Sequence, residues 1–166
     1  LFLDRARKDP RNAYRMLQAY NDWHIDEWCG AHPARFMPLA QLPRWDVPLM
    51  LAELRRVLAK GCHAVTFPDN PVAQGLPSLH SDIWEPFWKL CNDEHVVINC
   101  HIGTGYQPPH PSLDSCIEAW ITSMPMSIGN AAADWITLDA FQRYTDLKMA
   151  LSEGGIGWVP YLLERA

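Results

Sequence analysis

Short apolar segments alternate with amphipathic helical segments along this chain, and this alternation constrains its fold more than any other feature. Four segments have the length and apolar character of strands: residues 36–42, 63–67, 96–102 and 147–153. Strands that are apolar on both faces are typical of parallel sheets covered by helices. We therefore expect an α/β domain with about four parallel strands, adjacent in this order and flanked by helices on one side.

The segments between the strands carry signals for helix starts. Asp9 can cap a helix whose first residue is Pro10, and Asp46 can cap a second helix. Two parallel architectures fit the resulting order, an open doubly wound sheet and part of a (βα)8 TIM barrel. A whole barrel needs eight strands and ~250 residues. Four strands correspond to about half a barrel, whereas an open flavodoxin-like sheet fits 166 residues on its own.

Composition narrows the class of protein further. A chain of 166 residues with 48% hydrophobic content suits one core-bearing domain. The net charge of −5 and the lack of a basic stripe argue against a nucleic-acid partner. No apolar run approaches the ~20 residues that span a bilayer, so no membrane partner is expected. The odd number and wide spacing of the cysteines argue against a disulfide framework and predict reduced thiols in a cytoplasmic protein. They are Cys29, Cys62, Cys91, Cys100 and Cys116.

The two ends of the chain do not resemble the ends of a domain. The first residue is Leu1, and residues 161–166 have a helical pattern with neither a glycine cap nor a following proline. We therefore expect residues 1–166 to be the central part of one barrel domain, truncated at both ends.

Polar side chains gather where the third and fourth predicted strands end. Asn99 and His101 share one face of their strand, which opens into a loop containing Gly103 and Gly105. Glu153 ends the fourth predicted strand, at the same end of the sheet. Ligand sites of parallel architectures lie at these carboxyl ends. We expect the side chains of His101 and Glu153 to point into the barrel interior together, beside a ligand-binding face that includes Asn99.

A histidine and a glutamate at the mouths of neighbouring strands can bind a metal ion or transfer protons. The alternative is structural, with His101 bonded to backbone and Glu153 at a helix N-terminus. His80, at the start of a predicted helix, is a second candidate for a substrate contact, or else a surface capping residue. We found no arrangement typical of a serine or cysteine nucleophile.

Three longer motifs follow one another in order along the chain. The first is FMPLAQLP at 36–43, followed by a helix and then by AVTFP at 64–68. The second is WEPFW at 84–88 with VVINCHIG at 96–103, and the third is YTDLKMALSEGG at 144–155. Together they resemble the amidohydrolase-related proteins, in the branch similar to aminocarboxymuconate semialdehyde decarboxylase. The resemblance covers residues 12–166.

This resemblance implies a metal-dependent (βα)8 barrel holding a divalent ion, with zinc as the expected metal. His101 matches a metal-binding histidine on a middle strand of the family. The family's His-x-His on the first strand and its late aspartate would lie outside residues 1–166. The family usually has a histidine before Gly-Gly that orients or deprotonates the metal-bound water. Glu153 stands there in this chain, and a carboxylate can serve as base or ligand.

The function expected on these grounds is that of a metal-dependent hydrolase or non-oxidative decarboxylase, a carboxy-lyase, of the amidohydrolase superfamily. Its substrate would be a small organic acid, ester or amide. Two alternatives stay open: a barrel fragment without catalytic competence, and a flavodoxin-like domain that binds a small molecule. A homo-oligomeric assembly also stays open.

Overall fold

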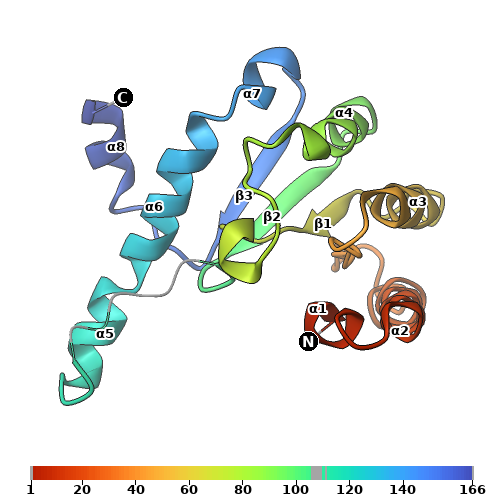
Figure 1. The fold of residues 1–166 in the computed structure, drawn as a ribbon, viewed down its shortest axis with the longest axis horizontal. Coiled ribbons are helices and arrows are strands. Elements are labelled where there is room, and N and C mark those ends of the chain that lie inside the picture. Colours follow the sequence, from red (N-terminus) through yellow and green to blue (C-terminus); the bar gives the residue numbers. More distant parts are fainter. Residues whose placement is uncertain (1, 106–109, 111, 166) are drawn as a thin grey trace.

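Three parallel strands form the centre of the computed structural model, which describes residues 2–105, 110 and 112–165 (Figure 1). Val65 of the first strand lies opposite Ile98 of the second, and His101 of the second lies opposite Ser152 of the third. The predicted α/β class and the parallel order are thereby confirmed. The strands are β1 (Ala64–Thr66), β2 (Val97–His101) and β3 (Lys148–Ser152), in that order across the sheet.

The segment 36–42, predicted as a strand, contributes one isolated bridge to the edge of β1. Ala40 N donates to Ala64 O at 2.9 Å, and Thr66 N donates to Ala40 O at 3.0 Å. The next hydrogen bond toward the N-terminus would need a donor at Pro38, which has no backbone N–H. The prediction of a full fourth strand is therefore wrong, although the segment occupies the place expected for it.

Helices precede each strand and run back along the sheet (Figure 1). Two predicted N-caps are present, because Asp9 Oδ1 accepts from Asn12 N and Asp46 Oδ1 accepts from Leu49 N, both at 3.0 Å. In the described ranges, no helix is both long enough and apolar enough to cross a membrane. The α-helices are α1 (Phe2–Ala6), α2 (Pro10–Asp22), α3 (Val47–Leu58), α4 (Glu85–Asp93), α5 (Ile117–Ser123), α6 (Pro125–Ile136), α7 (Ala140–Arg143) and α8 (Val159–Arg165). The π-helical segment η1 (Trp23–Cys29) continues α2, and the 3-10 turns are η2 (Pro71–Gln74) and η3 (Asp82–Trp84).

One face of the sheet is buried under helices, and the other face borders cavities. Val65, Ile98 and Cys100 are fully buried, whereas Thr66 and Asn99, on the opposite face, are partly exposed. The helical residues that share the core with the buried face come from α3, α4 and α6: Met50, Leu54, Val57, Phe87, Trp88, Cys91, Ile128, Ala131 and Trp135. A parallel arc with helices on one face is the arrangement of part of a (βα)8 barrel.

An aromatic cluster anchors the carboxyl end of β1 to this helical layer. Phe67 directly follows β1, and its ring centre lies 5.3–5.9 Å from four other rings. Each such pair contributes about 0.5–1.5 kcal/mol beyond the area it buries. Trp135 also donates from Nε1 to Asp69 O at 3.3 Å, which ties α6 to the loop after β1. The four rings around Phe67 belong to Trp84, Phe87, Trp88 and Trp135.

The loops that follow β1 and β2 are joined at the carboxyl end of the sheet. The Thr104 hydroxyl lies 3.0 Å from both Asp69 N and Asp69 Oδ1, and 2.8 Å from His101 O. A side chain at Gly105 would come within 2.4 Å of Asn70 O, so only glycine allows this approach. Part of the predicted loop 103–115 lies outside the described residues.

Candidate active site at the carboxyl ends of the strands

A cavity of about 240 Å³ lies at the carboxyl ends of β1 and β2, on the face that the helices do not cover. This is the place where ligand sites of parallel barrels occur. Of the predicted site residues, His101 and Asn99 line it. The full lining consists of Leu39, Gln41, Arg44, Thr66, Phe67, Pro68, Gln74, Asn99, His101, Thr104 and Ser152.

The ring of His101 is fixed by the backbone of the residue that follows it. Nδ1 lies 2.8 Å from Ile102 O. Because a carbonyl oxygen only accepts, Nδ1 is the donor in this hydrogen bond, and Nε2 is the nitrogen left for contacts with other groups. A backbone carbonyl that orients a histidine in this way is a common arrangement behind metal ligands. The role of His101 as a metal ligand stays a prediction, and Nε2 is the atom that would serve it.

Glu153 reaches that nitrogen, with Oε2 lying 3.1 Å from His101 Nε2. Simple strand alternation does not predict this contact, because Ser152 is the residue that pairs with His101 in the sheet. The chain leaves β3 at Ser152, and Glu153 adopts a left-handed conformation with φ 62°. Non-glycine residues rarely adopt this conformation, and here it accompanies a carboxylate turned toward His101.

The glycines after Glu153 fix this turn against α6. A Cβ at Gly154 would lie 1.8 Å from Ile128 Cγ2, so a larger residue has no room. Gly155 is also left-handed, with φ 60°. Trp158 Nε1 donates to Gly154 O at 2.8 Å. Close packing of the strand exit against a helix thus determines where the Glu153 carboxylate can lie.

Asn99 lies in the same cavity, but its amide nitrogen already serves the backbone. Nδ2 donates to Val97 O at 3.1 Å and to Val65 O at 3.4 Å. Asn99 also lines a second cavity of about 470 Å³ toward the amino ends of the strands. Its amide thus stiffens the sheet between two cavities, and its role as a substrate contact stays a prediction.

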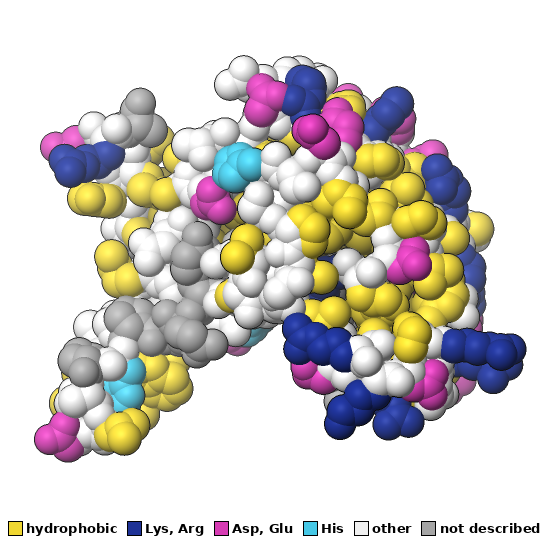
Figure 2. All heavy atoms as spheres, viewed as in Figure 1, with side chains coloured by type: hydrophobic (Ala, Val, Ile, Leu, Met, Phe, Trp, Pro, Cys, Tyr) yellow, Lys and Arg dark blue, Asp and Glu magenta, His cyan; other side chains and the backbone are white. Residues whose placement is uncertain are grey.

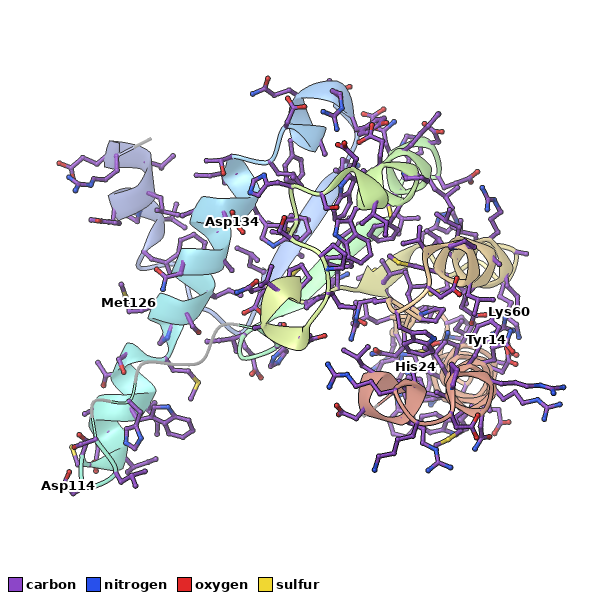
Figure 3. All side chains as sticks on the ribbon, viewed as in Figure 1. Tyr14, His24, Lys60, Asp114, Met126 and Asp134 are labelled. Carbon is purple, nitrogen blue, oxygen red and sulfur yellow. The ribbon has the colours of Figure 1, made fainter. Side chains whose placement is uncertain are left out.

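The structure does not bring His80 to this cavity. His80 Nε2 lies 2.8 Å from Asp134 Oδ1 of α6, whose position Figure 3 shows on the helical layer. His80 borders instead a small cavity of about 120 Å³ together with Glu85 and Arg143. Its role as a substrate contact also stays a prediction, and its contact with Asp134 of α6 is the one that the structure shows.

The polar lining of the main cavity also includes side chains that were not predicted as site residues, and Gln41, Arg44 and Gln74 are the longest of them. Gln41 Oε1 accepts a hydrogen bond from Thr66 Oγ1 at 3.0 Å. Burial lowers the pKa of Arg44. The sequence offers a single indication of the role of Arg44, its position. Arg44 follows the apolar segment 36–42, at the end of the sheet where ligands of parallel barrels bind.

His101 and Glu153 have the donor chemistry of zinc ligands, an imidazole nitrogen and a carboxylate oxygen. In the part of the chain that the structure describes, however, no group of three His, Cys, Asp or Glu side chains could hold a metal ion. A catalytic zinc site needs three protein ligands. The pair therefore fits two positions of such a site, and a further ligand would have to come from outside the described residues.

Comparisons with known proteins agree with this fold. The family model described as amidohydrolase matches residues 5–166, and the chain belongs to this family. Amidohydrolase-superfamily enzymes generally depend on divalent metal ions. No match was found among curated proteins.

Among solved structures, the chain is similar to 2,6-dihydroxybenzoate decarboxylase from Rhizobium, with a TM-score of 0.69 and 24% identity over 95% of this chain and 50% of that one. It is similar to an amidohydrolase from Mycobacterium avium subsp. paratuberculosis, with a TM-score of 0.71 and 21% identity. The match covers 95% of this chain and 43% of that one. It is also similar to 4-oxalomesaconate hydratase from Rhodopseudomonas palustris, with a TM-score of 0.63 and 21% identity. The match covers 93% of this chain and 42% of that one.

These likenesses concern the fold, and the chain spans half or less of the length of each of these proteins. The parallel arc is thus part of a (βα)8 barrel, as the sequence motifs implied. The alternative of an open flavodoxin-like domain is wrong, because family and fold both agree with the barrel.

Proposed function

We propose that the protein is a metal-dependent hydrolase or carboxy-lyase that acts on a small organic acid, ester or amide, with His101 and Glu153 at its reacting centre. The observation that carries the proposal is the 3.1 Å contact between His101 Nε2 and Glu153 Oε2 at the mouth of the sheet. Family membership supports it. A 2,6-dihydroxybenzoate decarboxylase solved in complex with 2,6-dihydroxybenzoate supports a small-molecule substrate.

His101 and Glu153 would have different roles in the reaction. A divalent metal ion, zinc in the first place, would lower the pKa of a bound water and supply hydroxide near neutral pH. His101 would hold the ion through Nε2, with its ring fixed by the Ile102 carbonyl. Glu153, more exposed than His101, would accept a proton from that water or donate one to the product.

We further infer that residues 1–166 are the central part of one barrel domain in the cytoplasm. All five cysteines are unpaired, as is typical of a reducing compartment. The domain would take a small-molecule substrate and neither a nucleic acid nor a membrane, and it could act as a homo-oligomer.

The proposal is tested by turnover measurements on the unaltered full-length protein and two variants, since residues 1–166 alone are expected to be inactive. CO2 release from 2,6-dihydroxybenzoate and hydrolysis of aromatic esters and amides cover the two reaction classes. We expect His101→Ala and Glu153→Gln each to lower the rate by about 100-fold or more, the usual contribution of an acid–base group. His63→Ala is the matched control, because His63 lies at the amino end of β1 and bonds to Glu94 O. Equal rates in all four proteins would contradict the proposal.

A second candidate is binding without turnover, which the incomplete ligand set favours. In that case the unaltered protein would bind an aromatic acid but release neither CO2 nor a hydrolysis product. Turnover that depends on His101 would exclude this candidate.

A further inference from the structure

Arg44 is a charged side chain that the proposed chemistry does not use. It follows the segment that is bridged to β1, and its Nε atom is buried without a hydrogen-bond partner. Among the described residues its guanidinium has no ion-pair partner. A guanidinium stays charged at any ordinary pH. Arg44 as a whole is partly exposed, but its buried Nε has neither contact with solvent nor a partner among the described residues, which is unfavourable. Such a side chain indicates that an anion binds beside it.

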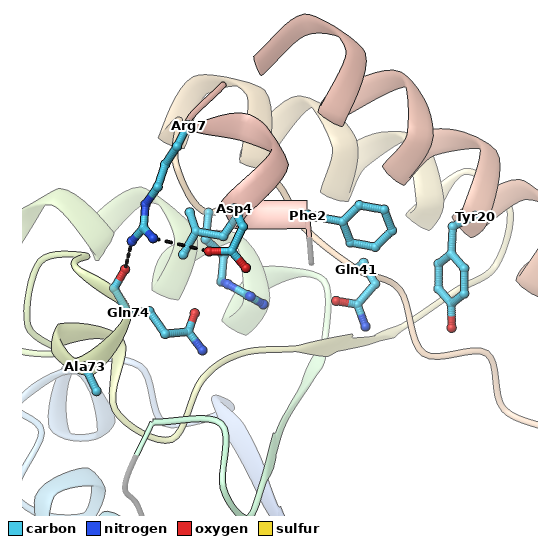
Figure 4. Close-up of a pocket in the computed structure, with 9 residues that line it drawn as sticks. Phe2, Asp4, Arg7, Tyr20, Gln41, Ala73 and Gln74 are labelled. Atoms are coloured by element: carbon cyan, nitrogen blue, oxygen red, sulfur yellow. Dashed lines mark hydrogen bonds and ion pairs between the residues drawn. The ribbon is translucent and has the colours of Figure 1, made fainter. Parts of the chain in front are cut away.

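The space for an anion is present on the structure. Arg44 lines the cavity of about 240 Å³ that contains His101 and also a cavity of about 560 Å³ between α1 and η2. Gln41 and Gln74 line both cavities too, and Figure 4 shows them on either side of the larger one. Arg44 therefore stands where the two cavities meet, at the mouth of the sheet.

The donors around this point suit a carboxylate. Thr66 holds Gln41 Oε1, and Gln41 Nε2 forms no hydrogen bond within the described ranges, so its N–H groups are available. Asp and Glu are missing from the described lining of the smaller cavity. Guanidinium and amide N–H groups without a competing carboxylate are a favourable set for a bound carboxylate.

The other arginine of the larger cavity does not offer such a site. Arg7 donates from Nη1 to Asp4 Oδ1 at 3.2 Å and from Nη2 to Gln74 O at 2.8 Å (Figure 4). Lys and Arg side chains also gather around α1 and α2 on the surface (Figure 2). This basic surface would attract an acid to the mouth, but Arg44 is the cation of the larger cavity for which no partner is found among the described residues.

We propose that Arg44, together with Gln41, binds a carboxylate group of the organic acid on which the protein acts, in the cavity that His101 lines. The identity of the ligand rests on the proposed function. The substrate would then be oriented with its carboxylate beside the segment before α3 and its reacting group beside β2 and β3. Arg44 would thereby select acids over neutral compounds of the same shape.

Titration of the protein with benzoate and with benzamide, its uncharged analogue, tests this inference. We expect Arg44→Leu to weaken benzoate binding by about 10-fold or more, because a hydrogen-bonded charge pair is lost. Benzamide binding should change by less than about 2-fold. The variant should also raise the melting temperature of the ligand-free protein, since it removes a partly buried charge whose Nε has no hydrogen-bond partner among the described residues.

Arg7→Leu is the matched control, because Arg7 lines the larger cavity but is already paired. It should leave benzoate affinity unchanged and give no rise in melting temperature. Arg44→Gln provides the same comparison if the leucine variant does not fold. A fall in melting temperature on removal of Arg44 would show a structural counter-ion and overturn the inference. Equal losses for benzoate and benzamide, or no benzoate binding by the unaltered protein, would also overturn it.

The two proposals fail in different ways. Arg44→Leu should leave the metal content unchanged, whereas His101→Ala should lower it. If turnover never appears, the difference between benzoate and benzamide still measures the role of Arg44. If His101→Ala lowers the metal content but Arg44→Leu weakens the binding of benzoate no more than that of benzamide, only the inference about Arg44 is wrong.

Discussion

Asn21 holds the segment that carries Gln41 and Arg44, and its removal gives the sharpest test of how the site is supported. Its side chain is fully buried on α2. Nδ2 donates to Gln41 O at 2.9 Å and to Glu53 Oε1 at 2.7 Å, and Oδ1 accepts from Gln41 N at 2.8 Å. The amide therefore pairs with both backbone groups of Gln41, as a neighbouring strand would.

Asn21→Ala would leave three partner atoms without these hydrogen bonds, one on the fully buried Glu53 and two on the partly buried Gln41. Each buried group left unpaired costs about 1–3 kcal/mol. The Glu53 carboxylate keeps Arg56, whose Nη2 lies 2.8 Å away, and water entering the vacated space would satisfy part of the rest. We therefore expect the free energy of unfolding to fall by about 3–6 kcal/mol, measured by urea denaturation of the protein.

Asn12→Ala is the matched control on the same helix. Asn12 is half-buried, and its side chain forms no hydrogen bond with the described residues, because its contact with Asp9 uses the backbone N. Its replacement should change the free energy of unfolding by no more than about 0.5 kcal/mol. A loss below about 1 kcal/mol for Asn21→Ala would refute the role assigned to Asn21.

Three further outcomes follow from the packing, the thiols and the ion pairs. Gly154→Ala should cost about 1–3 kcal/mol of stability through overpacking, whereas Gly157→Ala, with open space around it, should be nearly neutral by thermal unfolding. Peptide mapping after brief treatment of the native protein with a thiol reagent should find the label on Cys116, which is exposed, and not on the four buried cysteines. The pKa of Glu85 is lowered mainly by the hydrogen bond from Tyr144 and, to a smaller extent, by Arg143. The ionised Glu85 therefore stabilises the fold above about pH 4, and this contribution is lost as the pH falls through the folded-state pKa of Glu85. Urea denaturation should therefore show a smaller loss of stability on acidification from about pH 6 to about pH 3 in Tyr144→Phe than in the unaltered protein, and an equal loss would contradict it.

The order and direction of the strands could be predicted because they depend on local patterns. Apolar runs of strand length, and caps such as Asp9 and Asp46, are written in neighbouring residues. The segment 36–42 has the same apolar character, but Pro38 ends its hydrogen bonding to β1 after the bridge at Ala40. Sequence also does not show that Asn21, 20 residues away, pairs with the backbone groups of Gln41 where a neighbouring strand would.

The site was predictable in part for the same reason. Alternation along β2 correctly places Asn99 and His101 on one face. Alternation does not account for Glu153, which reaches His101 through a backbone turn of positive φ after the strand has ended. Arg44 was missed because a single arginine after an apolar segment is ordinary in sequence. Its significance appears when its burial and its two cavities are known.

Elemental analysis of the purified full-length protein and its His101→Ala variant tests the central proposal most directly. We expect about one divalent metal ion per chain in the full-length protein and a clearly lower content in His101→Ala, because a catalytic site keeps few protein ligands and the loss of one weakens it. His63→Ala, a histidine at the other end of the strands, should retain the full content. Equal metal content in the unaltered protein and His101→Ala would show that His101 is not a ligand and would contradict the proposed metal-dependent chemistry.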